Sequence, residues 1–323
     1  MRYYKITLST STTTKTAFNT ITYSSLNSDG SNNPMALQID LDLFQGLFHQ
    51  PSQNGMITIY GVPFADLSQA SNFTNADITI EVGMSAGLPL ANPKQAGIVI
   101  QGTVFQSYGN YQGTDVRLNL IIIPYSISPT AEANLSFNWI EGQTLTQAVS
   151  STLGVAFNLP ITGKFSDSIV ATETQPGIYF TMKSLAQYVN DTSLHAAQPV
   201  GYQGAVMSVN SNGITLSDGT APVKDITAIQ FTDIIGNLTW IDAVTIQAKL
   251  VMRHDLNVNG YVTFPPGAPT INNATQYNQI RNTISFDGTF QITTVRHVGS
   301  SRQPTADSWV TVIDAIISNP TLK

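Results

Sequence analysis

The sequence contains no cysteine, which excludes a disulfide framework, a thiolate metal site and a cysteine nucleophile. Charge is also scarce, because Asp, Glu, Lys and Arg make up 11% of the 323 residues, against about 25% in average proteins. The longest unbroken apolar run, Leu120 to Pro124, is far too short to span a membrane. The segment Met1 to Ser9 lacks the apolar core of a signal peptide. We therefore expect a soluble protein that is made and assembled in the cytoplasm.

Basic residues form no cluster anywhere in the chain. The net charge is −6. From Pro129 to Asp225, seven acidic residues outweigh three basic ones, whereas six of each cancel from Ile226 to Lys323. Without a run of Lys or Arg, nucleic-acid binding through phosphate neutralisation is disfavoured, although an acidic wall past which DNA slides is allowed. The polar surface must come from Ser, Thr, Asn and Gln, which suit surfaces that meet other proteins and equally suit exported glycan-binding proteins.

The first 125 residues are dominated by alternation of apolar and polar residues, the pattern of strands buried on one face. Between these strands, Pro63 to Ala70 reads as a short helix with proline in its first turn, able to cover the apolar face of an antiparallel sheet. The expected strands are Tyr3–Leu8, Thr16–Tyr23, Leu37–Leu43, Ile57–Tyr60, Ile78–Val82, Ile98–Val104 and Val116–Ile122.

The next hundred residues change pattern after the Pro/Ser segment at Pro124 to Pro129. Helical i, i+3, i+4 spacing of apolar residues occurs twice, once before Gly154, a helix-ending residue, and once behind Thr181, a suitable N-cap. We expect residues 126–225 to form a mixed α/β middle domain. The apolar positions are Leu145, Ala148, Val149 and Leu153 in the first helix, and Met182, Leu185, Ala186 and Val189 in the second.

The third section resumes strands and closes on a hairpin. Alternation at Val244–Leu250 and Tyr261–Phe264 is followed by a long Pro/Gly/Asn-rich loop, Pro265–Asn282, of the kind that is functional, mobile or disordered. The closing hairpin joins Ser285–Arg302 to Ser308–Ile317.

That hairpin has a looser counterpart early in the chain, where Ile100–Gln106 leads to Thr114–Ile123. Gly102-Thr103 then corresponds to Gly288-Thr289 and Asp115 to Asp307. Two ordinary hairpins can share so short a match by chance. The favoured interpretation is two related β-domains, residues 1–125 and 226–323, which flank the middle domain.

No catalytic constellation is found in the sequence. Gly83-Met-Ser-Ala-Gly87 matches a nucleophile elbow, but Pro89 and Pro93 prevent the helix that an elbow needs, so a tight loop is favoured. Asp40 and Asp42 share the polar face of one strand and read as solvated rather than as an acid–base pair across a cleft. We therefore expect no enzyme activity and no cofactor. We also expect no metal site, because no two of the four histidines have the spacing of metal ligands: His49, His195, His254 and His297.

Arg296, His297 and Arg302 concentrate positive charge and hydrogen-bond donors in the closing hairpin. They form either a solvated hairpin tip or a subunit interface with an acidic surface, such as the middle domain of a neighbouring copy. The three tryptophans are scattered, one to a section, and each is expected to anchor a core or an interface.

The order of elements resembles the baseplate hub proteins of contractile-tailed bacteriophages, the group that includes late-control-D-like tail proteins. The segments that carry the resemblance are Met35–Asp42, Gly55–Val62, Ile78–Met84 and Gly97–Thr103 for a first barrel, and Asp233–Trp240, Lys249–Asn257, Gly288–Arg302 and Trp309–Ala315 for a second. The middle section matches only in the position of its helices, which leaves its role open.

The resemblance implies a mainly β fold with a smaller α+β part, in which two tail-tube-type β-barrel domains flank a mixed α/β middle domain. It also implies a homotrimer whose six barrels surround a channel. A sixfold tail tube protein would bind one face and a threefold central spike protein the other. Tape-measure protein, baseplate wedge proteins and DNA passing through the lumen would be further partners. Nothing in the chain resembles a lysozyme domain.

Three readings remain open from the sequence. The first is the trimeric hub of a virion tail, in which open sheet edges are completed by neighbouring copies across an interface above roughly 2,000 Å². The second is another tail-tip ring protein of the distal tail type, with six copies. The third is a glycan-binding surface β-protein.

Overall fold

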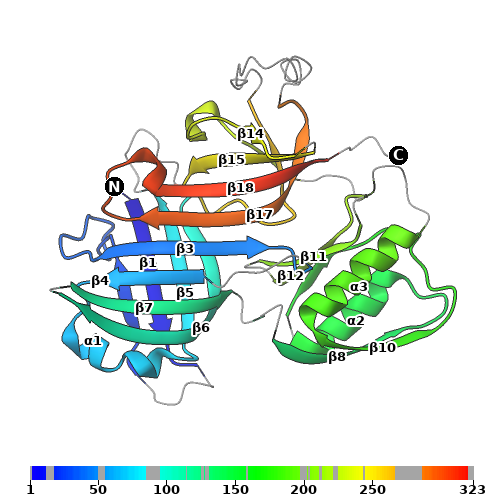
Figure 1. The fold of residues 1–323 in the computed structure, drawn as a ribbon, viewed down its shortest axis with the longest axis horizontal. Coiled ribbons are helices and arrows are strands. Elements are labelled where there is room, and N and C mark those ends of the chain that lie inside the picture. Colours follow the sequence, from blue (N-terminus) through cyan, green and yellow to red (C-terminus); the bar gives the residue numbers. More distant parts are fainter. Residues whose placement is uncertain are drawn as a thin grey trace.

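The fold is mainly β with a smaller α part, as expected from the sequence. The computed structural model describes residues 2–11, 18–49, 55–84, 95–113, 115–124, 127, 131–157, 159–196, 202, 204–210, 213–220, 225–242, 244–265 and 286–318. One sheet of 13 strands takes up both ends of the chain, and two small sheets with two helices form the middle section beside it (Figure 1).

The large sheet follows the order β14-β15-β18-β17-β3-β4-β7-β6-β5-β1-β2, with β16 beside β17 and β13 beside β16. Its first-section strands are β1 (Arg2–Ser9), β2 (Ile21–Ser24), β3 (Gln38–Gly46), β4 (Gly55–Tyr60), β5 (Asp77–Met84), β6 (Gly97–Gln112) and β7 (Asp115–Pro124). Its third-section strands are β13 (Ile226–Ala228), β14 (Thr239–Trp240), β15 (Thr245–Val251), β16 (Tyr261–Thr263), β17 (Thr289–Ser300) and β18 (Trp309–Ser318).

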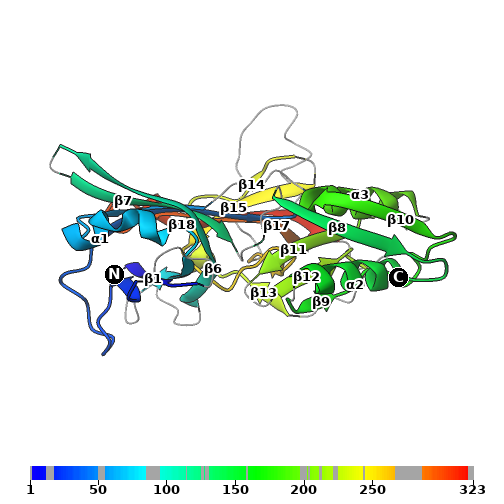
Figure 2. The same cartoon turned by 90° about the horizontal axis from the view of Figure 1, so that it is seen from below.

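The two ends of the chain meet along β17. Its first residues, Thr289–Gln291, pair with β16, and Thr294–Ser300 pair with β3 on the same side. The expected pair of barrels thus takes the form of one curled sheet whose halves share the β3–β17 border. Figure 2 shows β7, β15, β17 and β18 nearly edge-on in one layer, with β1 and β6 to one side of it.

Strand β6 is the corner at which the sheet curls. Gly97 to Thr103 pair with β5, whereas Gly102 to Gln112 pair with β7, and the register shifts opposite both partners. Such bulges bend a strand and increase its twist. The curl encloses the first apolar cluster, to which alternate residues of β3 contribute, as its period-two sequence predicts.

The expected helix after β4 is confirmed as α1 (Phe64–Ser68), preceded by Pro63 and followed by the 3₁₀ turn η1 (Ala70–Phe73). Both cover β6. A Cβ on Gly109 of β6 would lie 2.4 Å from Leu67 Cδ1, so any larger residue there would require the Leu67 side chain to move.

The middle section contains both helices that the apolar spacing predicts, α2 (Leu145–Phe157) and α3 (Met182–His195). Thr181 is the N-cap of α3 in a capping box with Ser184. The predicted apolar positions of both helices are buried in a second cluster. Around them lie the pair β8 (Glu132–Trp139) and β10 (Gln175–Thr181), and the three-stranded sheet of β9 (Ile161–Gly163), β11 (Val206–Asn210) and β12 (Gly213–Ser217).

The end of β3 connects all three apolar clusters. Leu47 packs into the cluster of the third section, and Phe48 packs into that of the middle section, where its N–H donates to Met207 O at 3.0 Å. Met252 and Trp309, from the third section, pack into the first cluster. The boundaries at 125 and 225 stay predictions, because neighbouring residues lie outside the described ranges.

Candidate subunit-interface site

Arg296 and Arg302 stand at the seam between the two halves of the sheet. Arg296 forms a two-pronged ion pair with Asp42 of β3, with Nε–Oδ1 at 2.7 Å and Nη2–Oδ2 at 2.5 Å. Both side chains are about half exposed, so the pair contributes about 0–1 kcal/mol. Arg302 Nη2 donates to Ala36 O at 2.6 Å. Both arginines therefore have partners inside the chain, and their role at a subunit interface stays a prediction.

His297 is a core residue in this structure. Its side chain is buried, and Nδ1 lies 3.0 Å from Thr311 Oγ1 of β18. Burial lowers the pKa of His297 to about 3, with a smaller effect from nearby His254. His297 is thus neutral and does not reach the surface on which Arg296 lies. Any contact of His297 with a neighbouring copy would require a local opening of the sheet.

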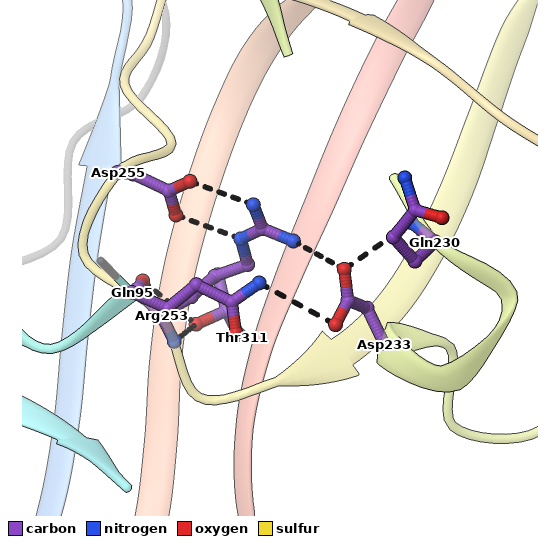
Figure 3. Close-up of polar contacts among 6 residues, drawn as sticks. All are labelled: Gln95, Gln230, Asp233, Arg253, Asp255 and Thr311. Carbon is purple, nitrogen blue, oxygen red and sulfur yellow. Dashed lines mark hydrogen bonds and ion pairs between the residues drawn. The ribbon is translucent and has the colours of Figure 1, made fainter. Parts of the chain in front are cut away.

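A buried charged network lies on the other side of Thr311 (Figure 3). Arg253, in the loop after β15, is 3% exposed. Its guanidinium donates to both Asp255 oxygens at 2.7 and 2.6 Å, and to Asp233 Oδ2 at 2.9 Å. Gln95 Nε2 approaches Asp233 Oδ1 at 3.4 Å.

This network holds the two halves together at a second point. The N–H of His254 donates to Gln95 O at 2.8 Å, and Arg253 N donates to Thr311 Oγ1 at 3.0 Å. The segment that enters β6 is therefore fixed to the loop after β15, and that loop is fixed to β18. The two carboxylates raise the pKa of Arg253 against the opposing effect of burial, which keeps the guanidinium charged.

The distal half of β6 is an open strand edge. Beyond Val104, β6 pairs with β7 on one side, and no strand of the described chain pairs with it on the other. Aromatic residues mark this stretch: Phe105 is 53% exposed and Tyr111 is 65% exposed. Unpaired N–H and C=O groups beside exposed aromatic rings are what an obligate interface covers. We call residues 105–111 the β6 edge.

The terminal strands of the large sheet are short by contrast. The path ends on β2, of four residues, and on β14, of two. Short edge strands protect a sheet against unwanted pairing. The β6 edge is therefore the better candidate for contact between copies.

Other residues noted in the sequence have ordinary structural positions. Trp139 and Trp309 are buried anchors, whose indole N–H groups donate to Gln143 O and Gly83 O, respectively. Asp40 accepts a hydrogen bond from Tyr60 at 2.7 Å on the outer sheet face. The Gly83–Gly87 motif continues beyond Met84 outside the described residues, as does most of the loop Pro265–Asn282.

Two kinds of feature are absent from the described residues. No helix there is long and apolar enough to cross a membrane. No group of three or more His, Asp or Glu side chains in these ranges is arranged to hold a metal ion.

The whole-chain fold is similar to two solved tail proteins, one of them from a prophage. The 43 kDa tail protein of prophage MuSo2 from Shewanella oneidensis matches with a TM-score of 0.51 and 9% identity, over 98% of this chain and 97% of that one. The tail protein from Neisseria meningitidis MC58 matches with a TM-score of 0.50 and 9% identity, over 97% and 96%. These likenesses show a shared fold across all three sections.

A weaker likeness involves the half-lidded PdpA–VgrG complex of Francisella. One of its chains gives a TM-score of 0.47 at 7% identity, over all of this chain and 59% of that one. A TM-score of this size supports no conclusion about partners. No family model and no curated protein sequence matches the chain.

Sequence reasoning missed the Arg253 network and the β6 edge. An arginine and an aspartate two residues apart, Arg253 and Asp255, look like any solvated pair, and only the fold buries them. The β6 edge had a signal in the sequence. The aromatic residues Phe105, Tyr108 and Tyr111 favour a strand that continues past Thr103, where pairing with β5 ends.

Proposed function

We propose that this chain is a structural protein of a phage-type tail, the central baseplate hub that joins the tail tube to the central spike. The observation that carries the proposal is the whole-chain fold shared with two tail proteins, one of them from a prophage, at 98% and 97% coverage of this chain. A match that takes in both halves of the curled sheet and the middle section is more specific than a match to one barrel.

The hub would be a homotrimer that surrounds the DNA channel. The β6 edge supports self-assembly, because each copy has unpaired backbone groups and exposed aromatic side chains that a neighbour can cover. Three copies with two sheet halves each would give a ring of six similar units. One face of this ring would match the sixfold tail tube, and the other face would match the threefold spike. Tape-measure protein and wedge proteins would be further partners.

The hub would be a non-catalytic scaffold that binds DNA without specificity. The acidic excess of the middle section and the absence of a basic cluster support passage of DNA through a channel rather than tight binding. Assembly would take place in the host cytoplasm before the tail is complete.

Arg296 and Arg302 would contact the acidic middle section of the neighbouring copy. We expect the double variant Arg296→Ser/Arg302→Ser to weaken assembly, and to weaken it more at low than at high salt, because screening reduces charge attraction in the unmodified protein. Sedimentation velocity at two salt concentrations measures this. Lys5→Ser, which breaks a partly exposed pair with Glu81 outside both the closing hairpin and the middle section, is the matched control. Unchanged assembly of the double variant at both salt concentrations removes the two arginines from the interface.

Image symmetry distinguishes the hub from a distal tail ring. Class averages of the purified oligomer by electron microscopy should show threefold symmetry with a central opening. Sixfold symmetry favours the distal tail reading. A monomer that binds glycans on an array favours the surface-protein reading.

A further inference from the structure

The middle section has one β-layer with an uncovered face. Helices α2 and α3 pack against one side of the β8–β10 pair. In Figure 1 the two strands lie below the two helices. On the other side, β8 shows the polar residues expected of a solvated face: Asn134, Ser136 and Asn138.

Strand β10 departs from this rule on the same face. Its outward residues Ile178 and Phe180 are 71% and 67% exposed. In register, Ile178 lies opposite Ser136. Two large apolar side chains that occupy successive outward positions form a small apolar strip, and such strips mark contact surfaces.

The same strand has a free backbone edge. Among the described strands β10 pairs only with β8, so its far side has no partner. Pro176 removes one N–H group at the start, and the register shifts between Tyr179 and Thr181 at the end. Gly177 to Phe180 thus remain available for pairing, directly beside the apolar strip.

Exposed carboxylates frame this face. Glu132 lies opposite Thr181 in register, Glu173 lies two residues before the start of β10, and the N–H of Glu141 donates to Thr174 Oγ1 at 3.2 Å. All three are exposed, and none forms an ion pair within the described ranges. The nearest cation in the sequence is Lys183, two residues after the end of β10, so the three carboxylates leave an excess of negative charge around the strip.

We propose that β10 binds an extended segment of another protein, which adds a strand to the free edge. Alternate apolar side chains of that segment lie over Ile178 and Phe180, and basic residues at its two ends meet the glutamates. Strand addition takes its affinity from main-chain hydrogen bonds and its specificity from alternate side chains. A second copy of the same face is disfavoured because its carboxylates would meet those of the first. The inference gives the middle section a docking role and does not depend on the hub proposal.

A designed peptide tests the inference with the full chain. The probe is a fluorescent peptide of about nine residues, in which Val and Thr alternate between terminal lysines; it spans the seven residues of β10. Fluorescence anisotropy should show binding that weakens at least about tenfold in Ile178→Ser/Phe180→Ser. Val155→Ser on α2 removes an apolar side chain that is 91% exposed and should leave binding unchanged. Near-UV circular dichroism checks that each variant is folded.

Two modified peptides and one mapping measurement separate strand addition from general stickiness. Backbone N-methylation at alternate residues should abolish binding, and replacing the lysines with glutamates should weaken it. Hydrogen exchange of the complex should show new amide protection within residues 175–181. The proposal is contradicted if the unmodified chain does not bind the probe, if the N-methylated peptide binds equally well, or if the serine variants change the mass of the protein instead of peptide binding.

Discussion

Arg253 shows how a single residue can join distant parts of this chain. Its side chain is 3% exposed and lies between Asp233 and Asp255, where an unpaired charge would be costly. Replacement by an apolar residue would leave the Asp233 carboxylate without its cationic partner. The consequence should appear in stability, because the network holds Gln95 and the start of β6 in place.

We predict that Arg253→Met lowers the free energy of unfolding by about 3 kcal/mol, the size found when one partner of a buried pair is removed. Adding Asp233→Asn should recover part of this loss, since it removes the uncompensated charge. Lys164→Met, at an exposed pair, should change stability by less than about 1 kcal/mol. Urea denaturation measures all three. An Arg253→Met protein as stable as the parent contradicts the structural role of the network.

His297 gives a prediction for pH. Its pKa in the folded chain is about 3, below the usual 6.5, so the folded state disfavours protonation. The stability that comes from a neutral His297 is complete above pH 6.5 and is lost as the pH falls toward 3. Between pH 7 and pH 5 the parent should lose about 2 kcal/mol more than His297→Gln. Denaturation series at both pH values test this, and parallel losses would show that His297 is accessible to protons when folded.

Residue types alone could not place these three side chains. Arg296, His297 and Arg302 looked equivalent as a basic cluster in one hairpin. Strand alternation puts Arg296 on the outer face and turns His297 toward Thr311, and this depends on a register that sequence does not specify. Asp42, read as a solvated carboxylate, pairs with Arg296 because β3 and β17 become neighbours across 254 positions of sequence.

At the scale of elements, the β6 edge is the feature with the clearest consequence. Half of a long strand lacks a partner on one side and carries exposed aromatic rings. Most natural proteins keep their edge strands short, place charged residues on them or cover them. The β6 edge is neither short nor charged, and no strand of the described chain pairs with its backbone, so a neighbouring copy is the simplest partner.

We predict that Phe105→Lys/Tyr111→Lys dissociates the assembly while the fold is retained. Both side chains are more than half exposed in the single chain, so the substitutions should change its stability by roughly 0.5 kcal/mol or less. Lysine on an edge strand opposes further pairing. Phe231→Lys, at an aromatic residue that is 64% exposed outside the edge, is the control. Sedimentation equilibrium that shows an unaltered mass for the double variant excludes the β6 edge as the interface.

Elements were more predictable than their arrangement. Alternation located β3, β5, β7 and the closing hairpin, and 3.6-residue spacing located α2 and α3, because each pattern reflects one buried face. The pairing of β3 with β17 was not predictable, since strand partners distant in sequence leave no local signal. Two bulges were also not predicted. In the β6–β7 hairpin and in the β17–β18 hairpin, the first strand shifts register soon after its Gly-Thr pair. This shared position adds to the likeness between the two hairpins.

The whole molecule is a curled sheet with a helical section attached at one end. Its three apolar clusters meet where Leu47 and Phe48 leave β3, so the sections are coupled rather than independent. Within this arrangement the β6 edge and β10 are open in different sections. We infer that the β6 edge contacts a neighbouring copy and that β10 contacts a different protein.

The mass of the purified protein in solution tests the central claim most directly. Each chain has a mass of 34.8 kDa, and the proposed hub of three copies would have a mass of about 104 kDa. Light scattering over a dilution series should show this mass at high concentration and a decrease in mass as the trimer dissociates. A folded 34.8 kDa monomer at every concentration, with cooperative unfolding, would contradict the account.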